Sequence, residues 1–340
     1  MINYVYQLVN PQFFSIKFEN VDLKSKVLVR PRFMSICQAD QRYYLGNREI
    51  NKLNEKLPMA LIHECCGEVV FDKTGTYKPG QNVVMVPNTL SNGEPLKDYM
   101  LENYVEGSYF LSSGYDGFMR EFVDISPDRL VPFENIPLQT AAITEFFSVA
   151  CQAVSRFDKF AHSTRETITI WGDGSLAYVL ACVLREKFPK SQLVVIGKNE
   201  RKLSRFSFVN QTYLNYELPD NFKTDHAFEC VGGESCYDAI DHIITHIRPQ
   251  GVVMLLGVSE NKIAIDTRLM LEKGLTMIGC SRSGKADFEE AVNLMKTQKV
   301  IRRLSSIIYE DSPVHNIDDI HRVFATDLNT PFKTVFEWKL

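Results

Sequence analysis

Four side chains in the first half of the sequence are of types that bind a transition metal. They are Cys37 in SICQAD, His63 and Glu64 in LIHECCG, and Glu145 in AAITEFF. Thiolate, imidazole and carboxylate form the donor set of a catalytic zinc, which keeps one position open for water or substrate. Each residue also has an ordinary structural role, as a core thiol, a hydrogen-bonded core histidine or an acid at a helix start. Taken singly, each is better explained by its ordinary role, so the metal site depends on the rest of the chain.

A second segment that could bind a ligand is the glycine-rich stretch GDGSLA, which follows the strand-like run TITIW. Gly172 permits a tight turn, Gly174 lets the backbone approach a pyrophosphate, and Ala177 is small enough for a helix to pack on the strand. Ser175 and Leu176 begin that helix, whose free N–H groups and positive dipole end suit phosphate. A glycine-rich turn without a ligand is the alternative, but strand, turn, helix and second strand together favour dinucleotide binding.

The end of the second strand distinguishes NADPH from NADH. An acidic residue there would bind the ribose 2′-hydroxyl and repel a 2′-phosphate. The strand LVVIG instead ends at Gly197, which leaves room, and Lys198, Arg201 and Lys202 follow it with positive charge. The alternative is a solvated basic helix face. The pattern favours NADPH. It predicts that the 2′-phosphate contacts the basic cluster of Lys198, Arg201 and Lys202, without deciding which of the three binds it.

The elements that must position these residues differ along the chain. Up to about residue 150 the segments are short, strand-like and separated by Gly and Pro, which is typical of a β domain. From there to about 280, strand-like and helical runs alternate, which predicts a parallel sheet and an α/β fold. The tail from 281 again resembles the first 150 residues and ends in the strand-like FKTVFEWKL. With 340 residues the chain suits two domains, 1–150 completed by 281–340, and 151–280.

Together these pieces resemble the zinc-dependent medium-chain dehydrogenases, in particular their polyol branch. The resemblance rests on Cys37-x-x-Asp40, the His63-Glu64 pair, DGFMREF, EFFSV and the glycine-rich turn. It implies a GroES-like β-barrel catalytic domain and a doubly wound Rossmann domain. It also implies that Cys37, His63 and Glu145 bind zinc, with Glu64 as a fourth or water-bridged ligand.

A finer resemblance, to the ribulose-5-phosphate reductases, runs from end to end. It is carried by CQADQRYY, LPMALIHE, SSGYDGFMREFV, WGDGSLAY, HAFECVGG, EKGLTMIGCSRSG and DLNTPFKTVFEW. The resemblance implies NADPH- and zinc-dependent reduction of D-ribulose 5-phosphate to D-ribitol 5-phosphate, for CDP-ribitol and wall or capsule polymers. It further implies a homodimer and a functional link to a cytidylyltransferase. Two alternatives remain: a dehydrogenase of an unphosphorylated polyol, and a non-catalytic NADPH-binding protein.

A phosphorylated ketose needs a cation beside the reacting carbon. Arg42 in QADQRYY is the first candidate and Arg282 the second, because a guanidinium binds phosphate through paired hydrogen bonds. Arg282 has an equally good alternative role, in contact with the cofactor or in a surface pair. Val258 and Ser281 are expected to seat the nicotinamide ring and its amide.

Proton delivery must differ from that of the alcohol dehydrogenases that the chain resembles. Their hydroxyl residue two positions after the first zinc cysteine is Ala39 in this sequence. Water, with Glu64 or Tyr43, is the expected route, although a tyrosine after a strand more often packs in the core.

Composition excludes several other classes. The net charge is −4 and basic residues are mixed with acidic ones, which argues against a nucleic-acid partner. No signal-like N-terminus and no apolar run of about 18 residues is present, so a cytoplasmic protein without a membrane span is expected. The eight cysteines contain no CxxC pair, and residues 88–112, where many relatives hold a structural zinc, contain none. One zinc per chain follows from that resemblance.

Overall fold

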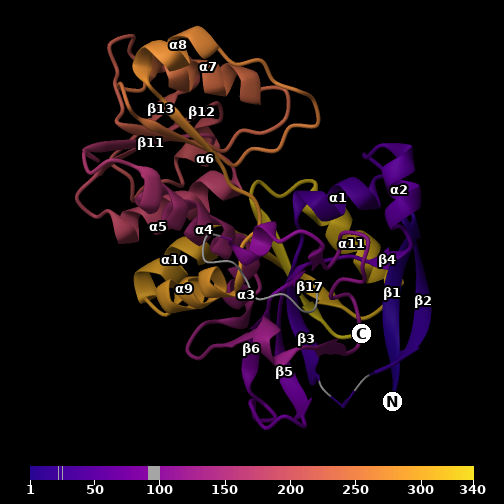
Figure 1. Cartoon of the computed structure of the whole chain (residues 1–340). Helices are drawn as coiled ribbons and strands as arrows, with labels where there is room; N and C mark the ends of the chain where they lie inside the picture. Colours follow the sequence, from indigo (N-terminus) through magenta and orange to yellow (C-terminus); the bar gives the residue numbers. More distant parts are fainter. Residues whose placement is uncertain (22, 25, 91–99) are drawn as a thin grey trace. The chain divides into compact units, whose positions relative to one another are not determined.

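The computed structural model describes residues 1–21, 23–24, 26–90 and 100–340, which form two compact units (Figure 1). Unit 1 contains Met1–Ser148 and Ser283–Leu340, and unit 2 contains Val149–Arg282. The division falls inside helix α4 (Thr144–Phe160), so the first turn of this helix belongs to unit 1. Among the described residues, no helix has the length and apolar composition of a membrane span.

Unit 2 is built on a six-stranded sheet in the order β13-β12-β11-β14-β15-β16, with every neighbouring pair parallel. The chain starts in the middle of the sheet, moves to one edge, returns and moves to the other, which is the doubly wound order. This confirms the predicted α/β Rossmann fold. The strands are β11 (Thr167–Trp171), β12 (Gln192–Gly197), β13 (Gln211–Leu214), β14 (His226–Glu229), β15 (Val252–Leu255) and β16 (Thr276–Gly279).

The helices of unit 2 connect these strands. They are α5 (Ser175–Lys187), α6 (Glu200–Leu203), α7 (Cys236–His246) and α8 (Thr267–Lys273), with the 3-10 turn η3 (Asn215–Glu217) after β13. Strands β12 and β15 contain the continuous apolar runs LVVI and VVML, which are typical of a sheet covered on both faces. The basic helix expected after β12 is only one turn long. Its N-cap Asn199 accepts a hydrogen bond from the Lys202 amide (3.1 Å), and the helix ends at Leu203.

Unit 1 is mainly β structure. Its largest sheet has the order β10-β6-β5-β3-β18-β17, with β9 also paired to β3, and a three-stranded sheet has the order β2-β1-β4. The C-terminal strand β18 pairs with β3, so the tail returns to the first part of the chain. The strands are β1 (Ile2–Asn10), β2 (Phe13–Asn20), β3 (Val27–Ser35), β4 (Met59–Ala60), β5 (Glu64–Asp72), β6 (Asn82–Met85), β7 (Asn88–Thr89), β8 (Tyr109–Phe110), β9 (Val123–Ile125), β10 (Leu130–Pro132), β17 (Ile308–Val314) and β18 (Lys333–Trp338).

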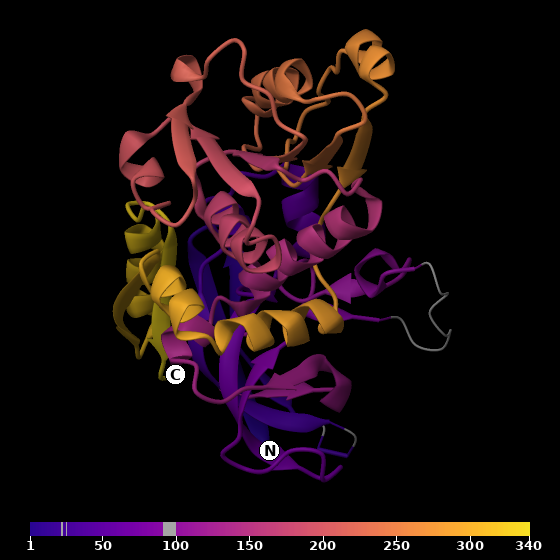
Figure 2. The ribbon, with the colours of Figure 1, turned by 90° about the vertical axis from the view of Figure 1, so that its left-hand side faces the viewer.

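Short helices cover the sheets of unit 1. They are α1 (Gln38–Tyr44), α2 (Ile50–Lys56), α3 (Leu138–Ala141), α9 (Lys285–Met295), α10 (Gln298–Ser305) and α11 (Ile317–Asp327), with the 3-10 turns η1 (Glu102–Tyr104) and η2 (Pro127–Arg129). Helix α9 packs against β10, and α10 packs against α3 (Figure 2). Helix α1 follows β3 directly, and β5 begins beside it, so the segments carrying Cys37 and His63 belong to one unit.

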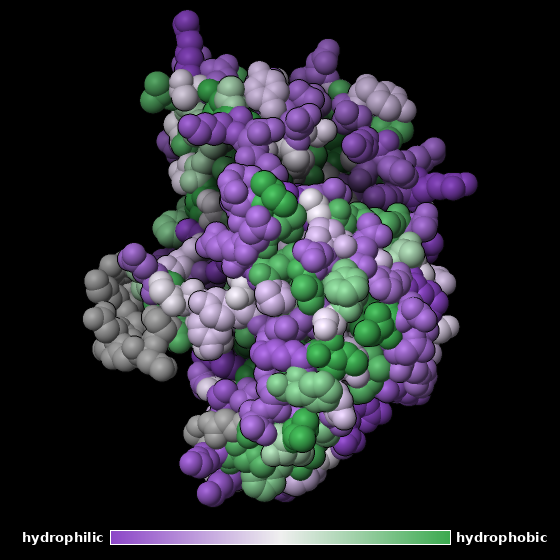
Figure 3. All heavy atoms as spheres, turned by 90° about the vertical axis from the view of Figure 1, so that its right-hand side faces the viewer, coloured by the Kyte–Doolittle hydropathy of each residue, from purple (hydrophilic) through white to green (hydrophobic). Residues whose placement is uncertain are grey.

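The β1–β2 hairpin is buried near its turn and exposed toward its open end. Leu8 and Phe14, beside the turn, join the core of unit 1, whereas Ile2, Tyr4 and Phe18 farther along the same face are exposed. Apolar side chains gather over this side of the molecule in Figure 3. Tyr4 and Phe18 are directly opposite in the strand register, and their ring centroids lie 5.2 Å apart. Cross-strand aromatic contact therefore supports the open end of the hairpin, where side chains are less buried than near the turn.

His226 makes the stability of unit 2 sensitive to acid. Its ring nitrogens lie 3.0 Å from the Thr164 carbonyl and 3.1 Å from the Val252 amide, and the Val252 bond requires an unprotonated nitrogen. Burial lowers the pKa of His226 from 6.5 to about 4. The unfolded chain therefore binds more protons below pH 6.5, and stability should fall as the pH drops from about 6.5 to about 4, by up to ~3 kcal/mol.

Urea unfolding of the wild type and His226→Gln between these pH values tests this expectation. The variant should be less stable at neutral pH but should lose less stability on acidification. Parallel pH profiles for the two proteins would show that His226 does not cause the acid sensitivity.

Candidate active site

Three of the predicted metal ligands meet in unit 1. Cys37 is the N-cap of α1, and His63 and Glu64 lie at the start of β5. One ligand atom from each of these side chains lies within 4.8 Å of those of the other two. His63 is 6% exposed and Glu64 is fully buried, whereas Cys37 is partly exposed, so the group can be reached from solvent on the side of its thiol. A sulfur, a nitrogen and an oxygen donor are thus gathered at one point.

Glu145 lies in the first turn of α4 and is outside this group of three, although its charge acts on both His63 and Glu64. Burial raises the pKa of Glu145 to about 7, the Glu64 carboxylate adds to this effect, and His63 opposes it. A buried carboxyl beside another carboxylate is costly to ionise without a cation. Such a group suits a metal ligand whose charge is compensated by the ion.

Asp40 connects the two segments that carry Cys37 and His63. Its carboxylate accepts hydrogen bonds from the Cys37 amide (3.0 Å), the Ile62 amide (3.0 Å) and the Ser112 hydroxyl (2.9 Å). Ile62 has a φ of +70°, a costly conformation for a β-branched residue, and the bond to Asp40 helps to hold it. The sequence motif contained Asp40, but its positioning role depends on contacts that the motif does not reveal.

Lys333 on β18 is a residue of the site that sequence reasoning missed. Its ammonium group donates to Glu64 Oε1 (2.7 Å) and to the Ile36 carbonyl (2.7 Å), and it lies 4.7 Å from the centroid of the Phe146 ring. Burial would lower the pKa of Lys333, but the Glu64 carboxylate raises it above its ordinary value. The lysine therefore stays charged and balances Glu64. A single lysine inside the apolar run FKTVFEW was the available signal.

The residues present fit a zinc ion. The other oxygen of Glu64 is buried without a hydrogen-bond partner among the described residues. The Nδ1 atom of His63 also makes no hydrogen bond there, although it lies 3.7 Å from Asp40 Oδ1. Buried polar groups of this kind are rare unless an ion, water or ligand satisfies them. Sulfur, nitrogen and oxygen donors of this kind are also the ligands that zinc accepts in proteins.

Removing the Lys333 charge should destabilise the protein strongly. In Lys333→Met the Glu64 carboxylate would be buried without a counterion, and we expect the free energy of unfolding to fall by about 3–5 kcal/mol. In Lys333→Met combined with Glu64→Gln, most of that loss should be recovered. Chemical denaturation of the four proteins of this cycle measures the coupling.

Lys339→Met is the matched control, because Lys339 forms an ion pair with Glu337 (2.9 Å) while its side chain is 44% exposed. It should change stability by less than about 1 kcal/mol. Equal effects at Lys333 and Lys339 would contradict the importance of burial.

The remaining predicted residues of the catalytic chemistry lie in different surroundings. Tyr43 is 2% exposed, and the guanidinium carbon of Arg48 lies 4.2 Å from the centroid of its ring. Arg42 is in α1 of unit 1, whereas Arg282 closes unit 2 with a φ of +58°. Tyr43 is thus a packed core residue beneath Arg48.

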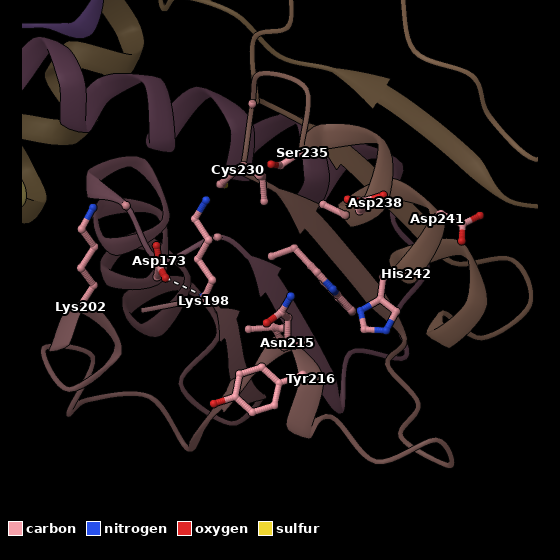
Figure 4. Close-up of a pocket in the computed structure, with 18 residues that line it drawn as sticks. Asp173, Lys198, Lys202, Asn215, Tyr216, Cys230, Ser235, Asp238, Asp241 and His242 are labelled. Atoms are coloured by element: carbon pink, nitrogen blue, oxygen red, sulfur yellow. Dashed lines mark hydrogen bonds between the residues drawn. The ribbon is translucent and has the colours of Figure 1, made fainter. Parts of the chain in front are cut away.

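A cleft of about 710 Å³ opens at the carboxyl ends of the parallel strands in unit 2 (Figure 4). Five predicted cofactor residues line it: Gly172, Gly174, Gly197, Lys198 and Lys202. Gly172 has a φ of +130°, a conformation open to glycine, and the helix that begins after Gly174 has no side-chain cap. Its first amides are therefore available to an anion.

The other predicted cofactor residues, Ser175, Leu176, Arg201, Val258 and Ser281, do not line this cleft. Val258 lies near its edge, where its carbonyl accepts a hydrogen bond from the Gly233 amide (2.8 Å). Sequence reasoning missed the residues that line the opposite side, after β13 and β14: Asn215, Tyr216, Cys230, Val231, Gly232, Ser235, Asp238, Ala239, Asp241 and His242. The strand ends preceding them were the only signal, because ligands bind at that edge of such sheets.

The space beside Gly197 has a different use from the one expected. A Cβ atom at Gly197 would lie 2.5 Å from the Cβ of Asp173, so the glycine makes room for Asp173. The Asp173 carboxylate accepts hydrogen bonds from the amides of Lys198 and Asn199 (2.7 Å each), as Figure 4 shows for Lys198. An acidic side chain, that of Asp173, therefore does lie at the end of β12, although it comes from the turn after β11.

Comparisons with known proteins match this architecture. Residues 24–135 match the family described as alcohol dehydrogenase GroES-like domain. The ribulose-5-phosphate reductase of Streptococcus pneumoniae is 50% identical, over 100% of this chain and 98% of that protein. The ribulose-5-phosphate reductase of Bacillus spizizenii is 45% identical over 100% of both chains. The crystal structure of S. aureus TarJ in complex with NADPH superposes with a TM-score of 0.88 at 42% identity, covering 100% of both chains.

Proposed function

The chain belongs to the ribulose-5-phosphate reductases of the medium-chain dehydrogenase family, and on this premise we propose that it reduces D-ribulose 5-phosphate to D-ribitol 5-phosphate with NADPH. It is an enzyme, an oxidoreductase, which sets aside a non-catalytic role. The observation that carries the proposal is the pair of sites: a metal-type donor group in unit 1 and a dinucleotide cleft with two lysines in unit 2.

Within the proposed reaction the chain's own residues bind and orient. Bound NADPH would supply the hydride and bound zinc would polarise the ketose carbonyl that receives it. Cys37, His63 and Glu64 would hold the metal, with Glu145 beside them, and Asp40 and Lys333 fix their positions. The burial of His63 and Glu64 strengthens the electrostatic interactions of these two side chains.

Groups of two kinds in unit 2 would hold the cofactor. The turn from Gly172 to Gly174 and the start of α5 would receive the pyrophosphate through backbone amides. Lys198 and Lys202 would receive the 2′-phosphate. Because Tyr43 is packed in the core, we assign proton delivery to water instead of to its hydroxyl.

Kinetics with ribulose 5-phosphate and unphosphorylated ribulose test the proposal. NADPH oxidation by the metal-loaded enzyme should show kcat/KM lower by about a hundredfold or more for ribulose, because an arginine–phosphate contact is worth several kcal/mol. Arg42→Ala and Arg282→Ala, measured with both substrates, identify the residue that binds the phosphate. A small effect of the phosphate would favour the alternative, a dehydrogenase of an unphosphorylated polyol.

The family also suggests a wider setting for the product. Ribitol 5-phosphate would enter CDP-ribitol synthesis for a wall or capsule polymer, through a cytidylyltransferase that consumes it. A homodimer in the cytoplasm belongs to the same proposal.

A further inference from the structure

One face of helix α7 forms the wall of the dinucleotide cleft away from the lysines. Ser235, Asp238, Ala239 and His242 all line the cleft. Their spacing of i, i+3, i+4 and i+7 places them on a single helix face. Figure 4 shows Asp238 and His242 on the side of the cleft across from Lys202. The cleft therefore has a basic side and a side that carries a hydrogen-bond acceptor.

Asp238 is exposed and ready to accept a hydrogen bond. Within the described part of the chain, no hydrogen bond or ion pair engages its carboxylate. The next residue, Ala239, has the smallest side chain after glycine, so a flat ring could lie against the helix there. A negative charge in a cleft for a polyanionic nucleotide is unfavourable unless it contacts a donor on that nucleotide.

The direction of the bound dinucleotide follows from the groups already placed. Lys198 and Lys202 take the phosphate on the adenosine ribose, and the glycine-rich turn takes the pyrophosphate. The base attached to that ribose must then occupy the remainder of the same cleft, toward α7. Adenine presents there a 6-amino group, which donates hydrogen bonds, and a carboxylate can only accept them.

From this juxtaposition we propose that Asp238 recognises the 6-amino group of the adenine base, with the ring lying against Ala239. The inference rests on the NADPH part of the proposed function and deepens it. Asp238 is thus a specificity-determining residue of the cofactor site, and it makes the enzyme select an aminopurine dinucleotide. A hypoxanthine base carries a carbonyl oxygen in place of the amino group. That oxygen and the Asp238 carboxylate are both hydrogen-bond acceptors, so they would repel each other.

The test compares NADPH with its reduced hypoxanthine analogue, in which only the 6-amino group is changed. Dissociation constants are measured by nucleotide fluorescence on the full chain, without substrate. The wild type should bind NADPH about tenfold more tightly or better, the value of a hydrogen bond to a charged group. In Asp238→Asn the ratio should fall to about one or two, because the amide can donate to the carbonyl oxygen of hypoxanthine.

Asp241→Asn is the matched control. It removes the same charge from the same helix, and Figure 4 shows the Asp241 side chain directed away from Lys198. Loss of the Asp241 charge should strengthen binding of both nucleotides alike, whereas Asp238→Asn should change the ratio of their dissociation constants. An equal ratio in the wild type, an unchanged ratio in Asp238→Asn, or an equal change in Asp241→Asn would overturn the inference. Failure of the wild type to bind NADPH would instead overturn the cofactor assignment.

Discussion

Cys37→Ser should leave the protein folded but without stoichiometric zinc, and its kcat/KM should fall by about a thousandfold or more. Cys37 supplies the single sulfur donor of the group formed with His63 and Glu64. A serine hydroxyl is a much weaker zinc ligand than a thiolate, and the proposed metal would stabilise the charge that develops at the substrate carbonyl. Elemental analysis of the purified protein measures the metal, and NADPH oxidation measures the activity.

Cys65→Ala is the matched control for this substitution. Cys65 is buried two positions beyond His63, burial raises its pKa well above the ordinary value, and its thiol donates to the Cys66 carbonyl (3.4 Å). It is therefore a packing residue, and the variant should keep its zinc and most of its activity. If Cys37→Ser retained one zinc per chain, or if the chelated wild type were fully active, the metal assignment would be wrong.

Removing both cleft lysines should change the choice of cofactor. In Lys198→Ala combined with Lys202→Ala, the KM for NADPH should rise about thirtyfold to hundredfold, whereas the KM for NADH should change little. Each lysine is expected to contribute ~1 to 1.5 kcal/mol to binding of the 2′-phosphate, and NADH lacks that group. Initial rates with both nucleotides give the two constants, and the effect on NADPH should shrink at high salt.

Lys190→Ala provides the comparison for net charge, because Lys190 is an exposed lysine of the same unit that does not line the cleft. It should leave both constants near their wild-type values. A wild type that prefers NADH, or a double variant in which both constants rise together, would refute the role given to the lysines.

The sequence was sufficient for the parts of the fold that depend on local pattern. The apolar run of β11 and the glycines that follow it predict the central strand and the turn, because both are set by neighbouring residues. The family resemblance predicted Cys37, His63 and Glu145 as ligands with Glu64 as a fourth or water-bridged one. The ligand atoms of Cys37, His63 and Glu64 are close in space, and Glu145 is outside that group. The roles of these residues in metal binding stay a prediction.

The parts that sequence reasoning missed depend on contacts between distant segments. Lys333 and Glu64 are separated by 269 positions, and only the pairing of β18 with β3 brings them together. The cleft residues on α7 follow β14, whereas the glycine-rich turn follows β11. Spacing along the sequence therefore does not reveal that these two segments line the same cleft. The use of the space beside Gly197 was predicted wrongly for a similar reason. The rule applied to the end of β12 considers one strand, whereas Asp173 from the turn after β11 fills that space.

The Asp173 bonds have a consequence for how the cofactor binds. They join the turn after β11 to the turn after β12 through two backbone amides, so these two turns of the proposed nucleotide site are fixed relative to each other before a nucleotide arrives. The conformational entropy of ordering these turns is lost during folding and would not oppose binding. This part of the proposed site is therefore preorganised for a nucleotide.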